Sequence, residues 1–587
     1  MSNPQWFTYH FEAVSIQEYI FAGSKLKDMV AASELVDKLC REPLDEAVKA
    51  LGLTKVSSLP KTDEQIAFPR AAGGAFIAVL KSQKHAQRFA AMWTLFMAEF
   101  APSLKFTASL GEGESLVNTV VNGIDKQKSK RNLTANSLPA ATPLMERSPR
   151  TGDWVVAYDQ HAAGGAETLD RPSFTKREFA KENAKLKNKQ NNEHVDVKGL
   201  DTKFLGSSNQ DNFVFPVCME HQDLHGCKKQ IPFPFSDKGT AEDGEHYIGM
   251  IHADGNGLGQ FLHSFFEVLK NQNDEDYYAA YNTFTTGLEA ATEKAGQVAT
   301  EKVLFPHKQT LSGQDKPILP MRPIILGGDD LSVICRADLA FDFCQVFIET
   351  FEAETQTLMT KINKMVKMED PMDKLTACAG IAFVKSNQPF YMAAHLAENL
   401  CGQAKKVSRE ARAEHSANKG LIASSLAFHH VTNSLFEDAS TAVEQELTAK
   451  HDNNTYLLTL KAYQLVGQPQ PGLVAWSDFK ALAGGFGESD EKLGIATLRN
   501  LATWLHADID RAKELYERWQ QVSESTEHGK QAWAKWQNNL RKLGVESGQL
   551  FLKHKNKDGT EIHSNPFSDL LAYHSMVKEQ QTLGAQA

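Results

Sequence analysis

Two adjacent carboxylates after a pair of glycines are the residues of this sequence best suited to chemistry. Asp329 and Asp330 follow Gly327 and Gly328 at the end of an apolar, β-rich run. Residues 331–335 again favour a strand, so the pattern predicts a hairpin with acids at its tip. Carboxylate oxygens are hard ligands suited to Mg²⁺ or Mn²⁺, and adjacent acids repel each other unless a cation lies between them. Because nucleotidyl-transfer enzymes hold two metals with such acids, the hairpin predicts a two-metal site.

A second acidic motif lies upstream, where an expected strand over residues 246–253 ends in Asp254. A glycine-rich turn and a helix start follow: Gly255, Asn256, Gly257 and Gly259. Backbone N–H groups at a helix N-terminus bind anions, so this motif predicts one metal ligand and a phosphate-binding turn. Asp, Gly and Asn are also common in ordinary turns. The order of the two motifs, strand–Asp–helix and then hairpin–Asp–Asp, favours a palm-type nucleotide site.

With these motifs the sequence resembles the large polymerase-like subunit of type III CRISPR effector complexes, a family with two palm (nucleotide-cyclase-like) domains. The resemblance covers most of the chain and is strongest over 247–258, 324–334 and 376–406. In the last stretch an expected strand leads into a helix that contains Lys405. The resemblance implies that this lysine meets the nucleotide triphosphate. GGDEF-type diguanylate cyclases share the palm layout, but here Asp330 takes the fourth motif position and no Phe follows, so the CRISPR-type pattern fits better.

The resemblance implies an α+β fold with two ferredoxin-like palm domains, an irregular linker domain and a C-terminal helical domain. We expect these domains over 1–120 (first palm), 121–240 (linker), 241–425 (second palm) and 426–587 (helical). A chain of 587 residues is too long for one core, which agrees with several domains. Residues 71–80 have the position of a hairpin motif but lack its acids. We therefore expect a first palm that has lost its metal ligands and helps to form the nucleotide pocket.

Two features of the family are absent or altered. The family often begins with an HD nuclease domain, whereas this sequence starts directly in the expected first palm, so we expect a form without that domain and without DNA cleavage. The family also tends to carry a four-cysteine zinc knuckle between its palms. Here the chain has a C-x2-H-x3-H-x-C cluster of Cys218, His221, His225 and Cys227. Its second pair is closer than in most zinc sites, so we expect a loop with incidental Cys and His, and zinc is the alternative.

Composition limits the location and the partners. Hydrophobic residues make up 42% and charged residues 23%, as in ordinary globular proteins. The net charge of −10 means that nucleic-acid binding needs local basic patches. The basic run 171–189 is a candidate, although most such runs are solvated surfaces. We find no signal peptide and no apolar run near the ~20 residues that span a bilayer, and the seven cysteines are scattered. We therefore expect a cytoplasmic protein without membrane contact.

The activity that the resemblance implies is synthesis of a cyclic oligoadenylate from ATP in antiviral defence. Three carboxylates would bind two Mg²⁺ or Mn²⁺ ions: Asp254, Asp329 and Asp330. The phosphates would lie on the glycine-rich turn and on Lys405, and Gly327 and Gly328 would let the nucleotide approach the hairpin backbone. Asn256 stands where the family often has a second acid, so we do not count it among the metal ligands.

In the family, target RNA bound to the assembled complex switches the activity on. The expected partners are therefore ATP, other CRISPR effector subunits, guide RNA and target RNA. Two alternatives stay open: a stand-alone synthase of a cyclic dinucleotide, and a non-catalytic scaffold subunit of the RNA-guided complex. The intact acids of both motifs argue against a scaffold. The base and the ring size of the product do not follow from the residues.

Overall fold

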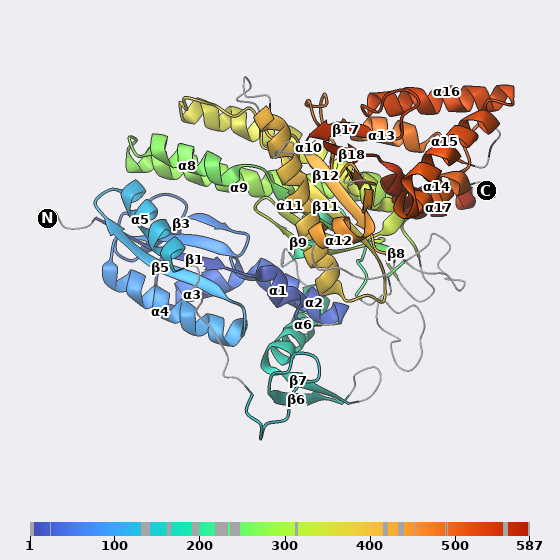
Figure 1. The fold of residues 1–587 in the computed structure, drawn as a ribbon. Helices are drawn as coiled ribbons and strands as arrows, with labels where there is room; N and C mark the ends of the chain where they lie inside the picture. Colours follow the sequence, from blue (N-terminus) through green and yellow to red (C-terminus); the bar gives the residue numbers. More distant parts are fainter. Residues whose placement is uncertain are drawn as a thin grey trace.

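The protein, seen in a computed structural model, combines large sheets with long helices (Figure 1). The structure describes residues 5–23, 25–130, 141–160, 166–190, 199–217, 233–234, 247–310, 315–414, 421–432, 439–451, 454–487, 489, 491–555 and 561–584. The N-terminal sheet and the C-terminal helices lie at opposite ends of the molecule (Figure 1). The mixed fold with helices and sheets that the sequence predicts is confirmed.

The N-terminal sheet has five strands in the order β2-β3-β4-β1-β5. They are β1 (Trp6–Ala13), β2 (Thr54–Val56), β3 (Gln65–Ala72), β4 (Ala75–Leu80) and β5 (Phe106–Gly113). Its helices are α1 (Ile16–Phe21), α2 (Leu26–Lys38), α3 (Glu42–Ala50), α4 (Gln83–Phe100) and α5 (Leu116–Ser129). Side chains alternate across a strand, and Phe11 of β1 packs edge-on against Trp93 of α4 at 5.6 Å between ring centroids. The apolar face of α4 thus covers one side of this sheet.

The segment between the two large sheets forms β6 (Val155–Asp159), β7 (Glu167–Asp170), α6 (Arg171–Gln190) and α7 (Leu200–Leu205). The β6–β7 hairpin projects at the bottom of Figure 1. Helix α6 contains the basic run, and its first half packs on the N-terminal helices. Lys176 is buried and donates to the carbonyl oxygen of Tyr19 at 2.7 Å. Arg177 is also buried and pairs with Asp28 at 2.9 Å. These two cations are therefore not available to RNA phosphates.

The second large sheet has seven strands in the order β16-β15-β12-β11-β8-β10-β9. They are β8 (Tyr247–Gly255), β9 (Met321–Gly327), β10 (Asp330–Arg336), β11 (Ala377–Lys385), β12 (Ser425–His430), β15 (Tyr463–Gln464) and β16 (Val474–Ala475). The connecting helices are α8 (Leu258–Leu269), α9 (Asp274–Ala299), α10 (Ala340–Met365) and α11 (Phe390–Glu414), with short turns over Thr300–Leu304, Phe305–His307 and Ala337–Leu339. Helix α11 lies close on β11, because a Cβ at Gly380 would come within 2.1 Å of the Ala397 carbonyl oxygen.

The C-terminal part contains helices α12 (Ala439–Glu446), α13 (Trp476–Ala483), α14 (Ile495–Ala507), α15 (Ile509–Ser523), α16 (Glu527–Lys542) and α17 (Phe567–Gly584). It also contains a small sheet, β13-β14-β18-β17, which the helical sequence pattern does not predict. Its strands are β13 (Thr448–His451), β14 (Asn454–Leu457), β17 (Leu552–Lys555) and β18 (Glu561–Ser564). Strands β15 and β16 of the large sheet also come from beyond residue 425. Among the described helices, none has both the length and the apolar composition to cross a bilayer.

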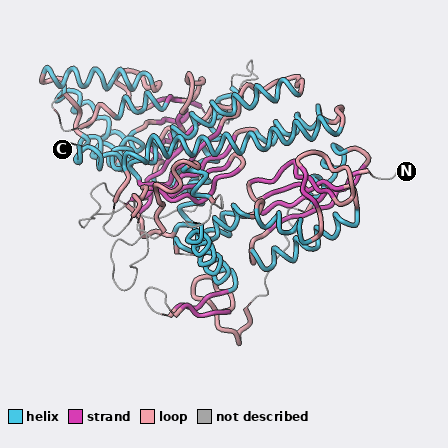
Figure 2. Tube along the Cα trace, turned by 180° about the vertical axis from the view of Figure 1, so that it is seen from behind, coloured by secondary structure: helices cyan, strands magenta, loops and turns pink. Residues whose placement is uncertain are grey.

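The two large sheets form separate groups of strands (Figure 2). Helix α9 packs against β3 of the first sheet and against β9 of the second. The carboxylate of Asp274, at the start of α9, accepts from the indole nitrogen of Trp6 at 2.6 Å. Its other oxygen accepts from the backbone N–H of Leu116 at 2.8 Å. Because charged acceptors make strong hydrogen bonds, these contacts fix the N-terminal sheet against the second half of the chain.

Candidate active site

Strand β8, an inner strand of the seven-stranded sheet, carries Asp254 near its C-terminal end. Residues 248–253 are buried, and the strand lies between β10 and β11. Gly255 follows, where the backbone passes so close to the hairpin that a Cβ would lie 2.5 Å from the Asp329 Oδ2 atom. Glycine is the residue that fits this approach. The strand therefore delivers one carboxylate directly beside the tip of the β9–β10 hairpin.

The β9–β10 hairpin carries the paired acids, as the sequence predicts. Gly327 pairs with Asp330 across the turn, and Gly328 has φ +64°, a conformation that favours glycine. One carboxylate oxygen each of Asp254, Asp329 and Asp330 lies within 4.8 Å of the other two. The three predicted metal ligands thus come together, although 75 positions along the chain separate the first from the second.

The electrostatics of this cluster favour a bound cation. Burial and, to a smaller extent, the charge of Asp254 raise the pKa of Asp329 to about 6. Although Asp330 as a whole is exposed at the edge of a concave surface, its carboxyl group is closely surrounded by protein. This desolvation, with the charges of Asp329 and Asp254 adding to it, raises the pKa of Asp330 well above its usual range. Three hard oxygen donors that repel one another fit Mg²⁺ or Mn²⁺.

Lys405 of α11 is the cation that the structure places beside the acids. Its ammonium group pairs with Asp254 and donates to the carbonyl oxygen of Gly255 at 2.8 Å. Burial lowers the pKa of Lys405, but Asp254 and further neighbours more than offset this, so its pKa is raised and it stays protonated. The lysine that the family resemblance singles out therefore lies in the cluster.

Within the glycine-rich turn, Gly257 and Gly259 border open space, whereas the Asn256 side chain is buried. Gly257 has φ +70° and caps α8 without a side-chain hydrogen bond, and the space where a Cβ of Gly259 would lie is open. Backbone N–H groups of the first turn of α8 can therefore meet an anion. Asn256 points the other way: it is 3% exposed and donates to Thr376 Oγ1 at 3.1 Å. Its side chain does not join the acid cluster.

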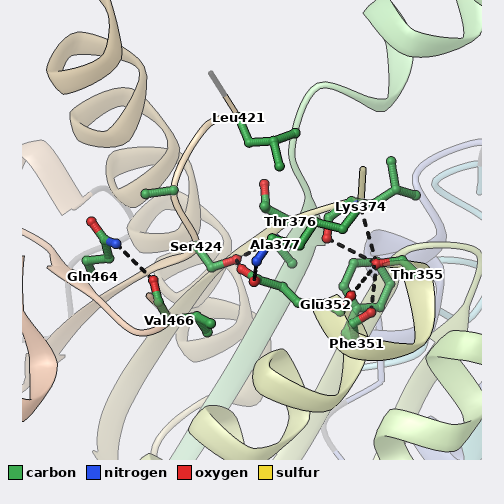
Figure 3. A network of polar contacts seen from close by, with 12 residues as sticks. Phe351, Glu352, Thr355, Lys374, Thr376, Ala377, Leu421, Ser424, Gln464 and Val466 are labelled. Atoms are coloured by element: carbon green, nitrogen blue, oxygen red, sulfur yellow. Dashed lines mark hydrogen bonds and ion pairs between the residues drawn. The ribbon is translucent and has the colours of Figure 1, made fainter. Parts of the chain in front are cut away.

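Thr376 belongs to a network of polar contacts (Figure 3). Thr376, the partner of Asn256, donates to the carbonyl oxygen of Ile422 at 2.7 Å. One residue further along, the N–H of Ala377 donates to Ser424 Oγ at 3.0 Å, and Ser424 donates to the buried carboxylate of Glu352. The network anchors the turn to α10 and to the start of β12. No spacing in the sequence indicates it.

Asp330 is the member of the acid cluster that lines a cavity of about 910 Å³ between the two large sheets. Residues of both halves line it, including Glu12, Gly73, Gly74, His252, Gly327 and Asp330. The turn Gly73-Gly74 of the first sheet packs directly on the hairpin tip, because a Cβ at Gly73 would lie 3.7 Å from the backbone nitrogen of Gly328. The two glycine turns that the sequence analysis aligned as related motifs thus face each other.

His252 is a residue of the cavity wall that the sequence analysis did not select. It is buried and shares a hydrogen bond with Ser332 at 3.0 Å. Burial lowers its pKa to about 4, so it is neutral at physiological pH. His252 stands two positions before Asp254, and side chains at i and i+2 share a face of a strand. That alternation was the signal that could have identified it.

Comparison with known proteins supports residues 247–413 as a palm domain. Residues 247–413 match the family model described as Cas10/Cmr2, second palm domain. The resemblance to the large subunit of type III CRISPR effectors is confirmed over this segment, which holds Asp254, the acidic hairpin and Lys405. A comparison with curated proteins gave no match.

Solved structures of Csm1–Csm4 assemblies are also similar. The Csm1–Csm4 subcomplex of the type III-A CRISPR-Csm interference complex is 12% identical, with a TM-score of 0.46 over 98% of this chain and 70% of that chain. The Csm1–Csm4 cassettes in complex with cA4 and with AMPPNP are 14% and 15% identical, with TM-scores of 0.38 and 0.37. Those two matches include 68% of this chain, which spans about half, 53%, of the length of the matched chains.

Part of the predicted chemistry falls outside the described residues. The possible zinc ligands Cys218, His221, His225 and Cys227 belong to that part of the chain. The zinc alternative therefore stays a prediction.

Proposed function

We propose that this protein is the large subunit of a type III CRISPR effector complex and synthesises cyclic oligoadenylate from ATP in the cytoplasm. The observation that carries the proposal is the convergence of Asp254, Asp329, Asp330 and Lys405. Asp330 of this group lines a cavity that is also lined by two facing glycine turns. The match of residues 247–413 to the Cas10/Cmr2 second palm supports it. A scaffold has no need to hold three mutually repelling carboxylates in one place.

Metal binding is the part of the proposal that the residues support most directly. Asp254, Asp329 and Asp330 would hold two Mg²⁺ or Mn²⁺ ions, which when bound activate an attacking hydroxyl and neutralise charge on the leaving group. The carboxylates would be deprotonated in that state, because the ligating form is the anion. Asp254 would then bind the metal, and its ion pair with Lys405 would weaken. The Lys405 ammonium group would thereby become available to a phosphate.

The cavity supports a nucleotide as the substrate. Its volume of about 910 Å³ lies near the upper end of ordinary ligand pockets, which allows more than one nucleotide. We propose that the donor ATP lies on the second sheet, with phosphates near Gly257, Gly259 and Lys405. Because Gly327 and Gly328 have no side chains, they would let the ATP approach the backbone of the hairpin closely. The acceptor nucleotide would lie against Gly73 and Gly74 of the first sheet.

The choice of adenine, the cyclic product and activation by target RNA rest on the family resemblance. They are tested by incubating the protein with labelled ATP and Mg²⁺ or Mn²⁺, alone and with its co-purifying subunits, guide RNA and target RNA, and resolving the products by mass. Cyclic product only with partners and matched RNA would support the proposal. Product from the protein alone would favour a free cyclase, and no product under any condition would favour the scaffold.

A further inference from the structure

Strand β9, which leads into the acidic hairpin, is an edge strand of the seven-stranded sheet. It pairs with β10 on one side only, so every second carbonyl group faces away from the sheet. Edge carbonyls ordinarily bond to water or attract another strand. Here the outward carbonyls of Ile324, at an irregularity of β9, and of Leu326 are followed by the carbonyl of Gly328 in the turn, the residue before Asp329.

Three side chains from outside the sheet donate to these successive outward carbonyls. They are Ser33 of α2 to Ile324, Lys203 of α7 to Leu326 at 3.1 Å, and Thr292 of α9 to Gly328 at 2.6 Å. The donors come from three different elements and bond to alternate residues, two in β9 and one in the turn that follows it. Together they take the place of a neighbouring strand along the edge.

Lys203 is the most strongly held of the three donors. It is 5% exposed, and its ammonium group forms ion pairs with Asp37 of α2 at 2.9 Å and with Glu289 of α9 at 3.3 Å. Burial lowers its pKa, but these carboxylates more than offset the effect and raise it, so the group is charged. A charged donor makes a stronger bond to a carbonyl than a neutral one. Removal of its charge would also leave the acids poorly compensated.

We propose that Lys203, together with Ser33 and Thr292, is a positioning residue for Asp329 and Asp330. These donors fix the path of β9 and thereby keep the hairpin acids within reach of Asp254. The inference rests on the proposed function, because the metal site is what the hairpin position serves. Residues that orient metal ligands without touching the metal commonly change its affinity 10- to 100-fold.

The same contacts tie the site to the segment between the two large sheets. Asp201, two residues before Lys203 on α7, pairs with Arg322 of β9 at 3.2 Å. Helix α7 thus holds β9 at two points, and α2 and α9 hold Lys203 from the other side. A displacement of α7 would therefore reach the hairpin acids through Lys203.

The test compares Lys203→Met with Lys176→Met in the full chain. Both changes remove a buried ammonium group that donates to a backbone carbonyl, but the bond of Lys176 is to Tyr19 on α1. We would measure hydrogen exchange of the peptide 321–336 by mass spectrometry, and Mn²⁺ affinity by electron paramagnetic resonance. We expect faster exchange in this peptide and a Kd for Mn²⁺ raised about tenfold or more for Lys203→Met only.

Unchanged exchange and unchanged Mn²⁺ affinity in folded Lys203→Met would overturn the inference, as would an equal effect of Lys176→Met. If Lys203→Met does not fold, Thr292→Val, which removes one neutral bond to Gly328, should give a smaller effect of the same kind. The exchange readout needs neither metal nor activity. A wild-type protein without Mn²⁺ affinity would thus count against the proposed function, and the exchange of the hairpin would still decide the inference.

Discussion

Charge repulsion among three carboxylates defines the site at the scale of single residues. The pKa of Asp329 is raised to about 6 by burial and by Asp254, against ~3.9 in an unfolded chain. The folded protein therefore binds this proton more tightly. In metal-free buffer the contribution of Asp329 to stability should be fully present below about pH 4 and should be lost as the pH rises through about 6.

Chemical denaturation in EDTA at a series of pH values would measure this dependence. Asp329→Asn should reduce the loss of unfolding free energy between about pH 4 and 6, because the amide does not ionise. Saturating Mn²⁺, added in place of EDTA, should also reduce this loss of unfolding free energy in the wild-type protein. An identical pH profile for wild type and variant would contradict the pKa assignment.

Gly255 is required by its distance from Asp329. A methyl group there would lie 2.5 Å from the Asp329 carboxylate, so Gly255→Ala should displace the acid and weaken Mn²⁺ binding about tenfold or more. The control is Gly402→Ala on α11, where nothing lies within 4 Å of the added Cβ. Titration with Mn²⁺ would compare them, and equal affinities would show that the close approach does not matter.

At the scale of elements, two glycine turns packed against each other join the halves of the site. Gly73 has φ +62° and contacts the hairpin tip, whereas Gly52 has φ +69° and nothing near its Cβ position. Alanine at either position should cost about 1–2 kcal/mol of unfolding free energy through backbone strain.

Only Gly73→Ala should also lower nucleotide synthesis, because relaxation of its turn shifts the Gly327–Gly328 backbone. Rates measured at equal folded concentration would separate the effects of the two variants. Equal rates for both would mean that the packed turns do not set the site geometry.

Asn256 stands where the family often has a second acid, but its side chain is buried against Thr376 and away from the acid cluster. Asn256→Asp would put a carboxylate near the Ala423 carbonyl and Thr376 rather than near a metal. We expect a loss of about 1–3 kcal/mol in stability, from an unsatisfied buried polar group, and no gain in Mn²⁺ affinity. Denaturation and metal titration of this variant would check both, and tighter Mn²⁺ binding would place residue 256 in the metal site.

The local motifs could be predicted from the sequence because each depends on neighbouring residues. The Gly327–Asp330 turn, the end of β8 and the helix that contains Lys405 all follow from turn chemistry and apolar patterns. The contacts that complete the site join distant segments: Lys203 to Leu326, Gly73 to Gly328, and Ser424 to Glu352. No periodicity specifies such pairs. The β14–β18 pair, whose strands are far apart in the chain, was missed for the same reason.

At the scale of the whole molecule, the cavity belongs to neither half alone. Its walls come from both large sheets, α9 fixes one sheet to the other through Asp274, and Lys203 connects the intervening segment to the hairpin. An assembly that shifts these parts would therefore act on the acids from a distance. This arrangement agrees with a site that partners and RNA regulate, which is part of the proposed function.

The most direct test of the central claim is synthesis from labelled ATP and Mn²⁺ by the assembled complex with matched target RNA, comparing wild type with Asp329→Asn/Asp330→Asn. The control is Glu369→Gln/Asp370→Asn, which alters two adjacent acids that are exposed in the same half. We predict that product disappears in the first variant, with normal assembly and folding, and persists in the second. Product formed at the wild-type rate by Asp329→Asn/Asp330→Asn would contradict the account, because nucleotidyl transfer would then take place without the hairpin acids.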